Sequence, residues 1–142
     1  MKYSRSESTE SKTTEPEPSV AVRVFLVEDM PRLQALMGEL LRSMGDFTLV
    51  GSATTEAEAI QWLKDHRDGW DLAVVDLILT QGSGIGVVAR CRQRAQGAKV
   101  VVFSDYVTPV LRDYCLSLGA DAALPKSDLQ AFIDYCGALA RR

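Results

Sequence analysis

Apolar and polar positions divide the chain into short apolar runs that alternate with amphipathic segments. The runs predict strands, and the run at residues 22–27 is typical of a strand buried on both faces of a sheet. They span residues 22–27, 47–53, 72–76, 99–104 and 122–125. Between and after them, apolar side chains recur every three or four residues, which predicts helices. These helices are expected over about residues 29–45, 55–66, 85–94, 109–118 and 128–142.

Helix boundaries are marked by residues that favour caps. Asp29 is placed to cap the first helix, with Pro31 in its first turn. Thr54 or Thr55 is placed to cap the second, and Glu58 completes a capping-box pattern with Thr55. The sequence therefore predicts where these helices begin.

The alternation of strands and helices predicts the fold. Five strands separated by helices give a parallel sheet that is covered on both faces. Right-handed connections make this a doubly wound α/β fold, with the flavodoxin-like strand order 2-1-3-4-5. In such sheets ligands bind beyond the carboxyl ends of the strands, so functional residues are expected there.

The first 20 residues differ from the rest. They hold five serines, three threonines, four glutamates and two prolines, with no large aliphatic side chain before Val20. Such a segment buries too little apolar surface to offset the entropy of ordering it. We expect a disordered tail over residues 1–20 and one domain over residues 21–142.

Composition narrows the function classes. The formal net charge is −3, which argues against a strongly basic nucleic-acid surface or a polybasic membrane patch. No apolar run approaches the roughly 18 residues that span a bilayer. The three cysteines form no CxxC pair, so neither a disulfide framework nor a cysteine zinc site is expected. These features predict a cytoplasmic protein that binds neither nucleic acid nor membrane.

Chemically active side chains stand at the predicted strand ends. They are Glu28 and Asp29 after the first strand, Asp76 at the end of the third, Ser104 at the end of the fourth, and Lys126 after the fifth. Crowded carboxylates repel one another, and Mg²⁺ is the natural cation to relieve that repulsion with oxygen ligands. A carboxylate beside Mg²⁺ can also act as a nucleophile and form an acyl phosphate. A lysine and a hydroxyl would then hold the phosphoryl oxygens.

The segments LVED, VVDL, VVFSD and GADAALPK, in this order, resemble the response regulator receiver domain of bacterial two-component signalling. The resemblance covers residues 22–142. It implies a phosphoprotein of phosphorelay signal transduction, with Asp76 as the phosphoacceptor, Ser104 as the switch hydroxyl and Lys126 as the phosphate-binding lysine. Such a protein assists its own phosphorylation without being an enzyme that turns over a substrate.

The resemblance also implies a Mg²⁺ site. Asp29 would ligate the ion directly, and Glu28 would contribute mainly through water. Asp76 and the backbone carbonyl of Ile78 would complete the protein's ligands.

Three positions depart from the family pattern. Ala123 stands three residues before the lysine, where receivers usually carry an aromatic switch residue. Ser127 follows the lysine in place of the usual proline, and Asp105 follows Ser104 where a small residue is usual. These departures leave phosphorylation expected but put the usual output switch in doubt.

Two apolar side chains are expected to flank the site. Ile78 lies two residues after the acceptor, and Tyr106 lies two residues after the switch hydroxyl. Large apolar groups there would exclude the attacking water, which predicts slow self-dephosphorylation.

The resemblance implies partners as well. The phosphoryl group would come from a sensor histidine kinase or a phosphotransfer protein. The signal would leave through a protein surface formed by about residues 107–142, or the phosphoryl group would pass on to another regulator, and a homodimer is left open.

One alternative is a receiver-like interaction module that acts without phosphorylation, motivated by Ala123 and Asp105. Another is a small phosphatase of similar topology, which would need a second acid at the position of Ile78.

A glycine-rich run, Gly82-Ser83-Gly84-Ile85-Gly86, follows the third strand. The dinucleotide fingerprint GxGxxG would require a glycine where Val87 stands, and no GK[ST] follows. We interpret the run as a flexible loop beside Asp76.

The single histidine, His66, lies far from the strand ends, which argues against a Ser-His-Asp triad.

Overall fold

The computed structural model describes residues 21–141, so the tail predicted over residues 1–20 lies outside the described residues. Strands and helices alternate as expected along the described part of the chain. The strands are β3 (Val22–Val27), β4 (Phe47–Ala53), β5 (Leu72–Val75), β6 (Lys99–Ser104) and β7 (Ala122–Pro125). The helices are α1 (Pro31–Ser43), α2 (Glu56–Asp65), α3 (Gly84–Arg90), α4 (Pro109–Ser117) and α5 (Leu129–Ala140).

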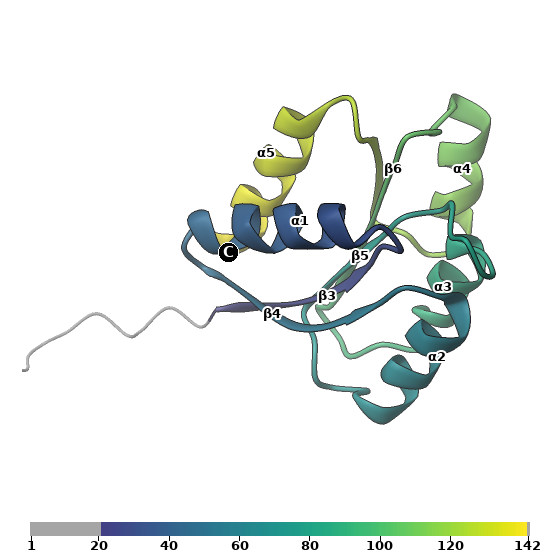
Figure 1. The fold of residues 1–142 in the computed structure, drawn as a ribbon, viewed down its shortest axis with the longest axis horizontal. Coiled ribbons are helices and arrows are strands. Elements are labelled where there is room, and N and C mark those ends of the chain that lie inside the picture. Colours follow the sequence, from purple (N-terminus) through teal and green to yellow (C-terminus); the bar gives the residue numbers. More distant parts are fainter. Residues whose placement is uncertain (1–20, 142) are drawn as a thin grey trace, which may run out of the picture.

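The strands form one parallel sheet in the order β4-β3-β5-β6-β7 (Figure 1). Numbered along the chain, this is the predicted order 2-1-3-4-5, and the doubly wound α/β fold is confirmed. β5 is the central strand and pairs with β3 on one side and β6 on the other. The side chain that follows β5 therefore lies at the middle of the sheet edge.

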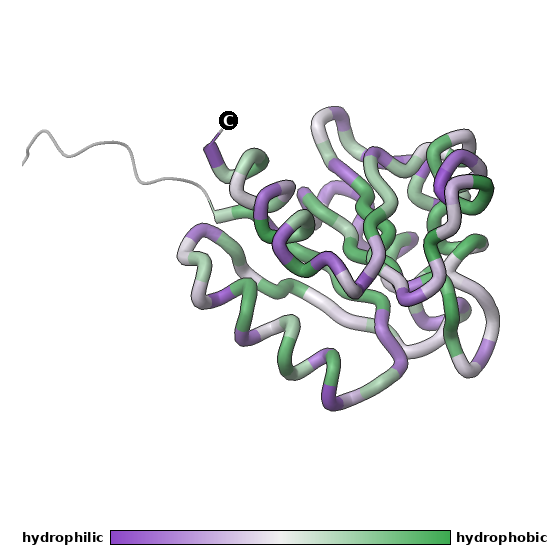
Figure 2. The backbone as a smooth tube through the Cα atoms, turned by 90° about the horizontal axis from the view of Figure 1, so that it is seen from above, coloured by the Kyte–Doolittle hydropathy of each residue, from purple (hydrophilic) through white to green (hydrophobic). Residues whose placement is uncertain are grey.

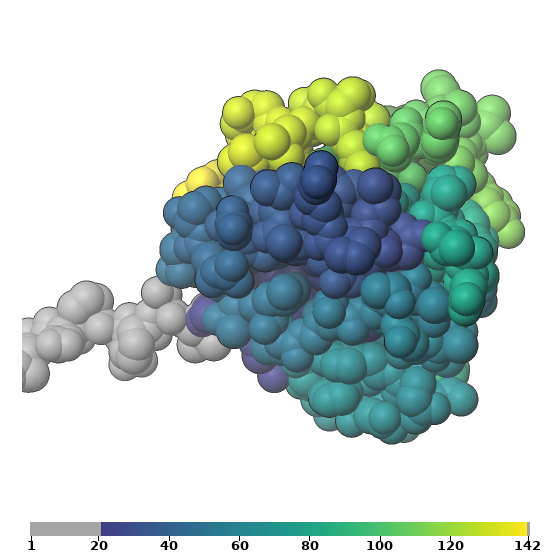
Figure 3. All heavy atoms as spheres, viewed as in Figure 1, coloured from purple at the N-terminus to yellow at the C-terminus, as the bar shows by residue number. Residues whose placement is uncertain are grey.

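The sheet separates two apolar cores, because successive side chains of a strand point to opposite faces. One core joins Ala73 and Val75 of β5 to residues of α2, α3 and α4. The other joins Leu72 and Val74 to residues of α1 and α5. Figure 1 shows these two groups of helices on opposite faces, Figure 2 shows hydrophobic stretches along the strands between them, and Figure 3 shows α1 and α5 adjoining.

Short polar side chains begin most of the helices. Thr55, Ser83, Thr108 and Asp128 each accept a hydrogen bond from a backbone N–H in the first turn of α2, α3, α4 and α5. Of the two threonines considered for α2, Thr55 is the cap, and Glu58 accepts from the backbone N–H of Thr54 at 2.8 Å. The first helix is the exception. The residue before it is Met30, which makes no side-chain cap, so the predicted cap at Asp29 is wrong.

The third helix ends earlier than predicted, at Arg90 instead of Arg94. After it the backbone tightens into turns, with Arg92 N–H donating to Ala89 C=O at 3.3 Å. The Arg94 side chain donates to Gly119 C=O, in the turn after α4, at 3.0 Å.

All three cysteines, Cys91, Cys115 and Cys136, are buried and form no disulfide. Burial raises the pKa of the Cys91 thiol to about 12, so this side chain behaves as a small apolar group.

Within residues 21–141, none of the helices has the length and apolar character that crossing a bilayer requires.

Candidate functional site

The predicted site residues converge at the carboxyl edge of the sheet. Glu28 and Asp29 follow β3, Asp76 follows β5, Ser104 ends β6, and Lys126 follows β7. Adjacent parallel strands end at the same edge, so residues far apart in the sequence become neighbours. Three of these residues, Glu28, Asp76 and Ser104, are the polar side chains described as buried. Buried polar groups need hydrogen-bond partners, and the side chains of this cluster provide them for one another.

Lys126 lies between two carboxylates. Its Nζ donates to Glu28 Oε1 at 2.7 Å and to Asp76 Oδ2 at 2.8 Å. Both contacts are ion pairs of mostly buried groups, and a buried charge is tolerated only when it is paired in this way. The ammonium is thereby held directly beside the Asp76 carboxylate.

Burial and pairing act in opposite directions on these charges. Burial raises the pKa of Glu28, and the bond from Lys126 offsets this only in part. Burial also disfavours the charged form of Lys126, but the bonds to Asp76 and Glu28 outweigh it and raise the pKa of the ammonium. Lys126 is therefore a permanent cation at neutral pH.

The second oxygen of Asp76 faces two other donors. Oδ1 accepts from Ser104 Oγ at 2.8 Å and from the Ile78 backbone N–H at 3.1 Å. Lys126 contacts Oδ2, so both carboxylate oxygens have hydrogen-bond donors. The residue is also only 7% exposed. A carboxylate fixed in this way beside an ammonium and a hydroxyl suits transfer of an anionic group.

Asp29 lies at the same edge but has different partners. Its Oδ2 accepts from the Thr80 backbone N–H at 2.6 Å and from the Thr80 hydroxyl. These bonds, the hydroxyl's first, lower the pKa of Asp29. They also explain why Asp29 does not cap α1, since its carboxylate faces the loop after β5. Thr80 is a site residue that sequence analysis missed, and its only signal is a hydroxyl four residues after Asp76.

A cleft of about 290 Å³ opens beside Asp76. Its lining includes Asp29, Asp76 and Ile78, whereas Glu28 lies outside the lining and bonds to Lys126. Among residues 21–141, no three His, Cys, Asp or Glu side chains are gathered as a ready cation cage. Mg²⁺ needs no such cage, because it usually keeps several waters and takes one or two carboxylates. Two carboxylates and a backbone carbonyl fit it, and the individual ligand roles stay predictions.

Apolar side chains from three loops surround the mouth of this cleft. Met30, Ile78 and Tyr106 all line it, with exposures of 54%, 57% and 67%. Asp105 also lines it and is exposed. Ala123, by contrast, is buried within β7. The predicted flanking positions of Ile78 and Tyr106 thus lie where water would approach Asp76.

The sequence analysis interpreted Gly84 as part of a flexible loop, and this is wrong. Gly84 is the first residue of α3. It is buried, and its N–H donates to Leu77 C=O at 3.0 Å. A Cβ at this position would lie 2.0 Å from the Asp76 carbonyl oxygen and 2.7 Å from Leu77 Cα. Only glycine allows α3 to begin this close to the backbone of Asp76 and Leu77.

Gly84→Ala is expected to lower the free energy of unfolding by about 3 kcal/mol, because both overlapping atoms are backbone and no side-chain rotation relieves them. Urea unfolding measures this change. Gly38→Ala is the matched control, since its Cβ would come no closer than 3.5 Å to another heavy atom and alanine favours the helix. Its stability should rise by up to about 1 kcal/mol. Equal stability of Gly84→Ala and the unaltered protein would contradict the steric argument.

Comparison with known proteins identifies the family. The family model of the response regulator receiver domain matches residues 24–135. The chain is 33% identical over 106 residues to protein-glutamate methylesterase/protein-glutamine glutaminase 3 of Anaeromyxobacter dehalogenans, covering 74% of this chain and 30% of that protein. It is 29% identical over 109 residues to the nitrate/nitrite response regulator protein NarL of Escherichia coli, covering 72% of this chain and 47% of that protein.

The fold also matches solved structures. One is CheY in the CheX–CheY–BeF₃–Mg complex from Borrelia burgdorferi, with a TM-score of 0.71, 20% identity, and coverage of 82% of this chain and 90% of that one. The chain spans about half or less of the length of the first curated relatives that it matches. The sheet order, the residues at its carboxyl edge and the matched family model agree: the chain belongs to the response regulator receiver domain family.

Proposed function

We propose that this chain is a phosphoacceptor signalling protein, which takes a phosphoryl group onto Asp76 with the help of Mg²⁺. One observation carries the proposal. Asp76 follows the central strand, and its two oxygens contact Lys126 Nζ and Ser104 Oγ, both at 2.8 Å. This arrangement supports the proposal, because a nucleophile, a cation and a hydroxyl donor would all lie within reach of one phosphoryl group.

The reaction is the transfer of one phosphoryl group from a phosphorylated histidine of the donor to the carboxylate of Asp76. An oxygen of Asp76 forms a bond to phosphorus, and the bond from phosphorus to the donor's imidazole nitrogen breaks. The electron pair of the broken bond stays on the imidazole, which takes up a proton. The products are an acyl phosphate and a neutral histidine.

Two side chains of this protein would stabilise the negative charge that develops on the phosphoryl oxygens during the transfer. The ammonium of Lys126 and the hydroxyl of Ser104 lie beside the positions that phosphoryl oxygens would occupy, and each can donate to one. Asp29, Asp76 and the Ile78 carbonyl would hold the metal, with Glu28 acting through water. Mg²⁺ supplies further neutralisation of the phosphoryl oxygens when bound.

Once formed, the acyl phosphate is expected to last. Met30, Ile78 and Tyr106 line the cleft, and their apolar surface would restrict the approach of water to the acyl phosphate. The chain is then a signalling protein with slow self-dephosphorylation, and not an enzyme with a turnover cycle.

The donor would be a sensor histidine kinase or a phosphotransfer protein in the cytoplasm. The output would leave through about residues 107–142, where α4 exposes Val110 and Tyr114 by 81% and 51%. A homodimer formed through this surface would be looked for in the phosphorylated protein.

The second candidate is an interaction module that acts without phosphorylation. The buried Ala123 favours it, because no aromatic ring is present there to change position. Asp105 also favours it, since its carboxylate lines the cleft that a phosphoryl group must enter.

Intact mass after incubation with acetyl phosphate distinguishes the two. The phosphoacceptor predicts a single phosphoryl adduct that forms with Mg²⁺ and does not form when a chelator removes the ion before acetyl phosphate is added. A mass that stays unchanged with both acetyl phosphate and a phosphorylated histidine donor would favour the interaction module.

A further inference from the structure

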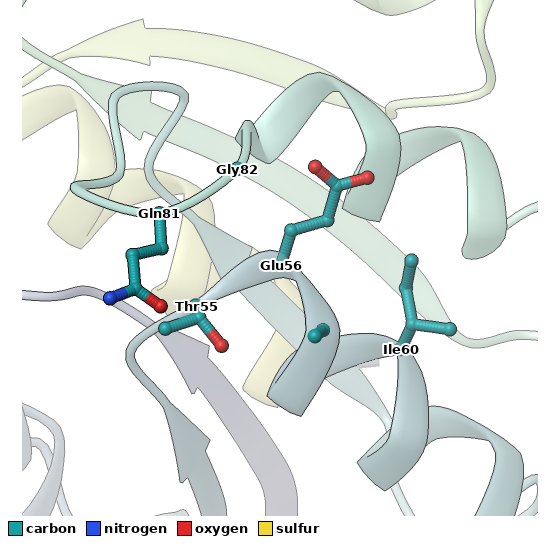
Figure 4. A pocket seen from close by; sticks show the side chains of 6 residues that line it. Thr55, Glu56, Ile60, Gln81 and Gly82 are labelled. Carbon is teal, nitrogen blue, oxygen red and sulfur yellow. The ribbon is translucent and has the colours of Figure 1, made fainter.

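Glu56 fastens the loop between β5 and α3 to the start of α2. Its carboxylate Oε1 accepts from the Ser83 backbone N–H at 2.8 Å, and its own backbone N–H donates to Gln81 C=O at 3.1 Å. Figure 4 shows the Glu56 side chain rising from the first turn of α2 beside Gln81 and Gly82. One residue therefore holds the loop at two points.

Two glycines of the glycine-rich run make room for this carboxylate. A Cβ at Gly82 would lie 2.4 Å from Glu56 Cβ, and a Cβ at Gly86 would lie 2.0 Å from Glu56 Oε2. Gly82 also has a φ of +84°, a conformation that other residues rarely adopt. Gly82 and Gly86 thus leave the space that the Glu56 side chain occupies, which gives these two glycines a steric role.

The same loop reaches the proposed metal ligands at two places. Ser83, which Glu56 holds, forms an antiparallel bridge with Ile78, whose carbonyl is one proposed ligand. Thr80 donates twice to Asp29, which is another. Glu56 itself is not among the residues that line the cleft. Its contacts therefore act on the ligands only through the loop.

We propose that Glu56 is a positioning residue that sets the affinity of the cleft for Mg²⁺ through this loop, without contacting the ion. The inference rests on the metal site proposed above. Mg²⁺ demands near-ideal ligand geometry, so a loop that shifts its carbonyl and carboxylate ligands weakens binding. Groups that orient metal ligands typically contribute 10- to 100-fold in affinity.

The test uses Mn²⁺ as a paramagnetic probe, with the free ion measured by electron paramagnetic resonance. Glu56→Ala is expected to weaken Mn²⁺ binding at least about tenfold. Glu56→Gln should bind nearly as well as the unaltered protein, because its amide oxygen still accepts from Ser83. Glu58→Ala is the matched control: it removes the same charge from the same end of α2, where Glu58 contacts Thr54 and Thr55 but not the loop.

The outcomes separate this inference from the proposed function. No Mn²⁺ binding by the unaltered protein overturns the metal site itself. Binding that is equal in the unaltered protein and Glu56→Ala overturns only the role of Glu56. A loss in Glu56→Gln as large as in Glu56→Ala shows that charge, and not loop position, is responsible.

Circular dichroism and thermal unfolding establish that each variant is folded. Should Glu56→Ala fail to fold, Glu56→Asp replaces it, because the shorter side chain draws the carboxylate away from the Ser83 N–H while the charge is kept. Weaker Mn²⁺ binding by Glu56→Asp is expected, and binding equal to that of the unaltered protein would overturn the inference.

Discussion

Asp76→Asn is expected to abolish the phosphoryl adduct completely. Asparagine is nearly isosteric, and its amide oxygen can still accept from Ser104 or Lys126, but it lacks the anionic oxygen that attacks phosphorus. Intact mass after incubation with acetyl phosphate and Mg²⁺ gives the result directly. The chain should remain folded, because the packing around β5 is unchanged.

Asp105→Asn is the matched control, since it changes a carboxylate that lines the same cleft but is exposed and outside the bonds to Asp76. This variant should still form the adduct. An adduct that persists in Asp76→Asn would place the acceptor elsewhere, and loss of the adduct in Asp105→Asn alone would reverse the assignment.

Lys126→Met is expected to slow formation of the adduct by about 100- to 1,000-fold, the usual effect of removing one group that stabilises a developing anion. Methionine has a similar length and keeps the apolar contacts of the lysine stem. The rate is obtained from a mass time course at fixed acetyl phosphate and Mg²⁺ concentrations.

Lys64→Met is the control for loss of a positive charge, because Lys64 is exposed in the last turn of α2. Its rate should equal that of the unaltered protein. Lys126→Met also leaves the buried Glu28 without its cation, and burial then favours the protonated form of that carboxyl. An unchanged rate in Lys126→Met would show that the ammonium serves only to neutralise Glu28 and Asp76.

The sequence was sufficient to predict the fold and the position of the site, for a definite physical reason. The central strand β5 is buried along its whole length and therefore appears as an uninterrupted apolar run, so that the polar residue after it marks the strand end. Because parallel strands end at one edge, Asp76, Ser104 and Lys126 could be placed together without coordinates. The structure confirms that convergence.

Side-chain partners could not be predicted in the same way. Asp29 was a reasonable helix cap by local pattern, yet it bonds to Thr80, 51 residues later. The glycine run looked flexible, whereas Gly84 is fixed by contact with the Asp76 backbone and Gly82 by contact with Glu56. Such contacts depend on distances between elements, which no local periodicity encodes.

The bond between Lys126 and Glu28 joins residues that are 98 positions apart, one after the first strand of the sheet and one after the last. Asp76, the proposed acceptor, is present in the chain long before its cation is. During synthesis, a chain that ends before β7 has the carboxylate but not the ammonium. If the proposed function holds, the full rate of phosphoryl transfer is expected only when the last strand docks, so that an incomplete chain competes poorly for a donor.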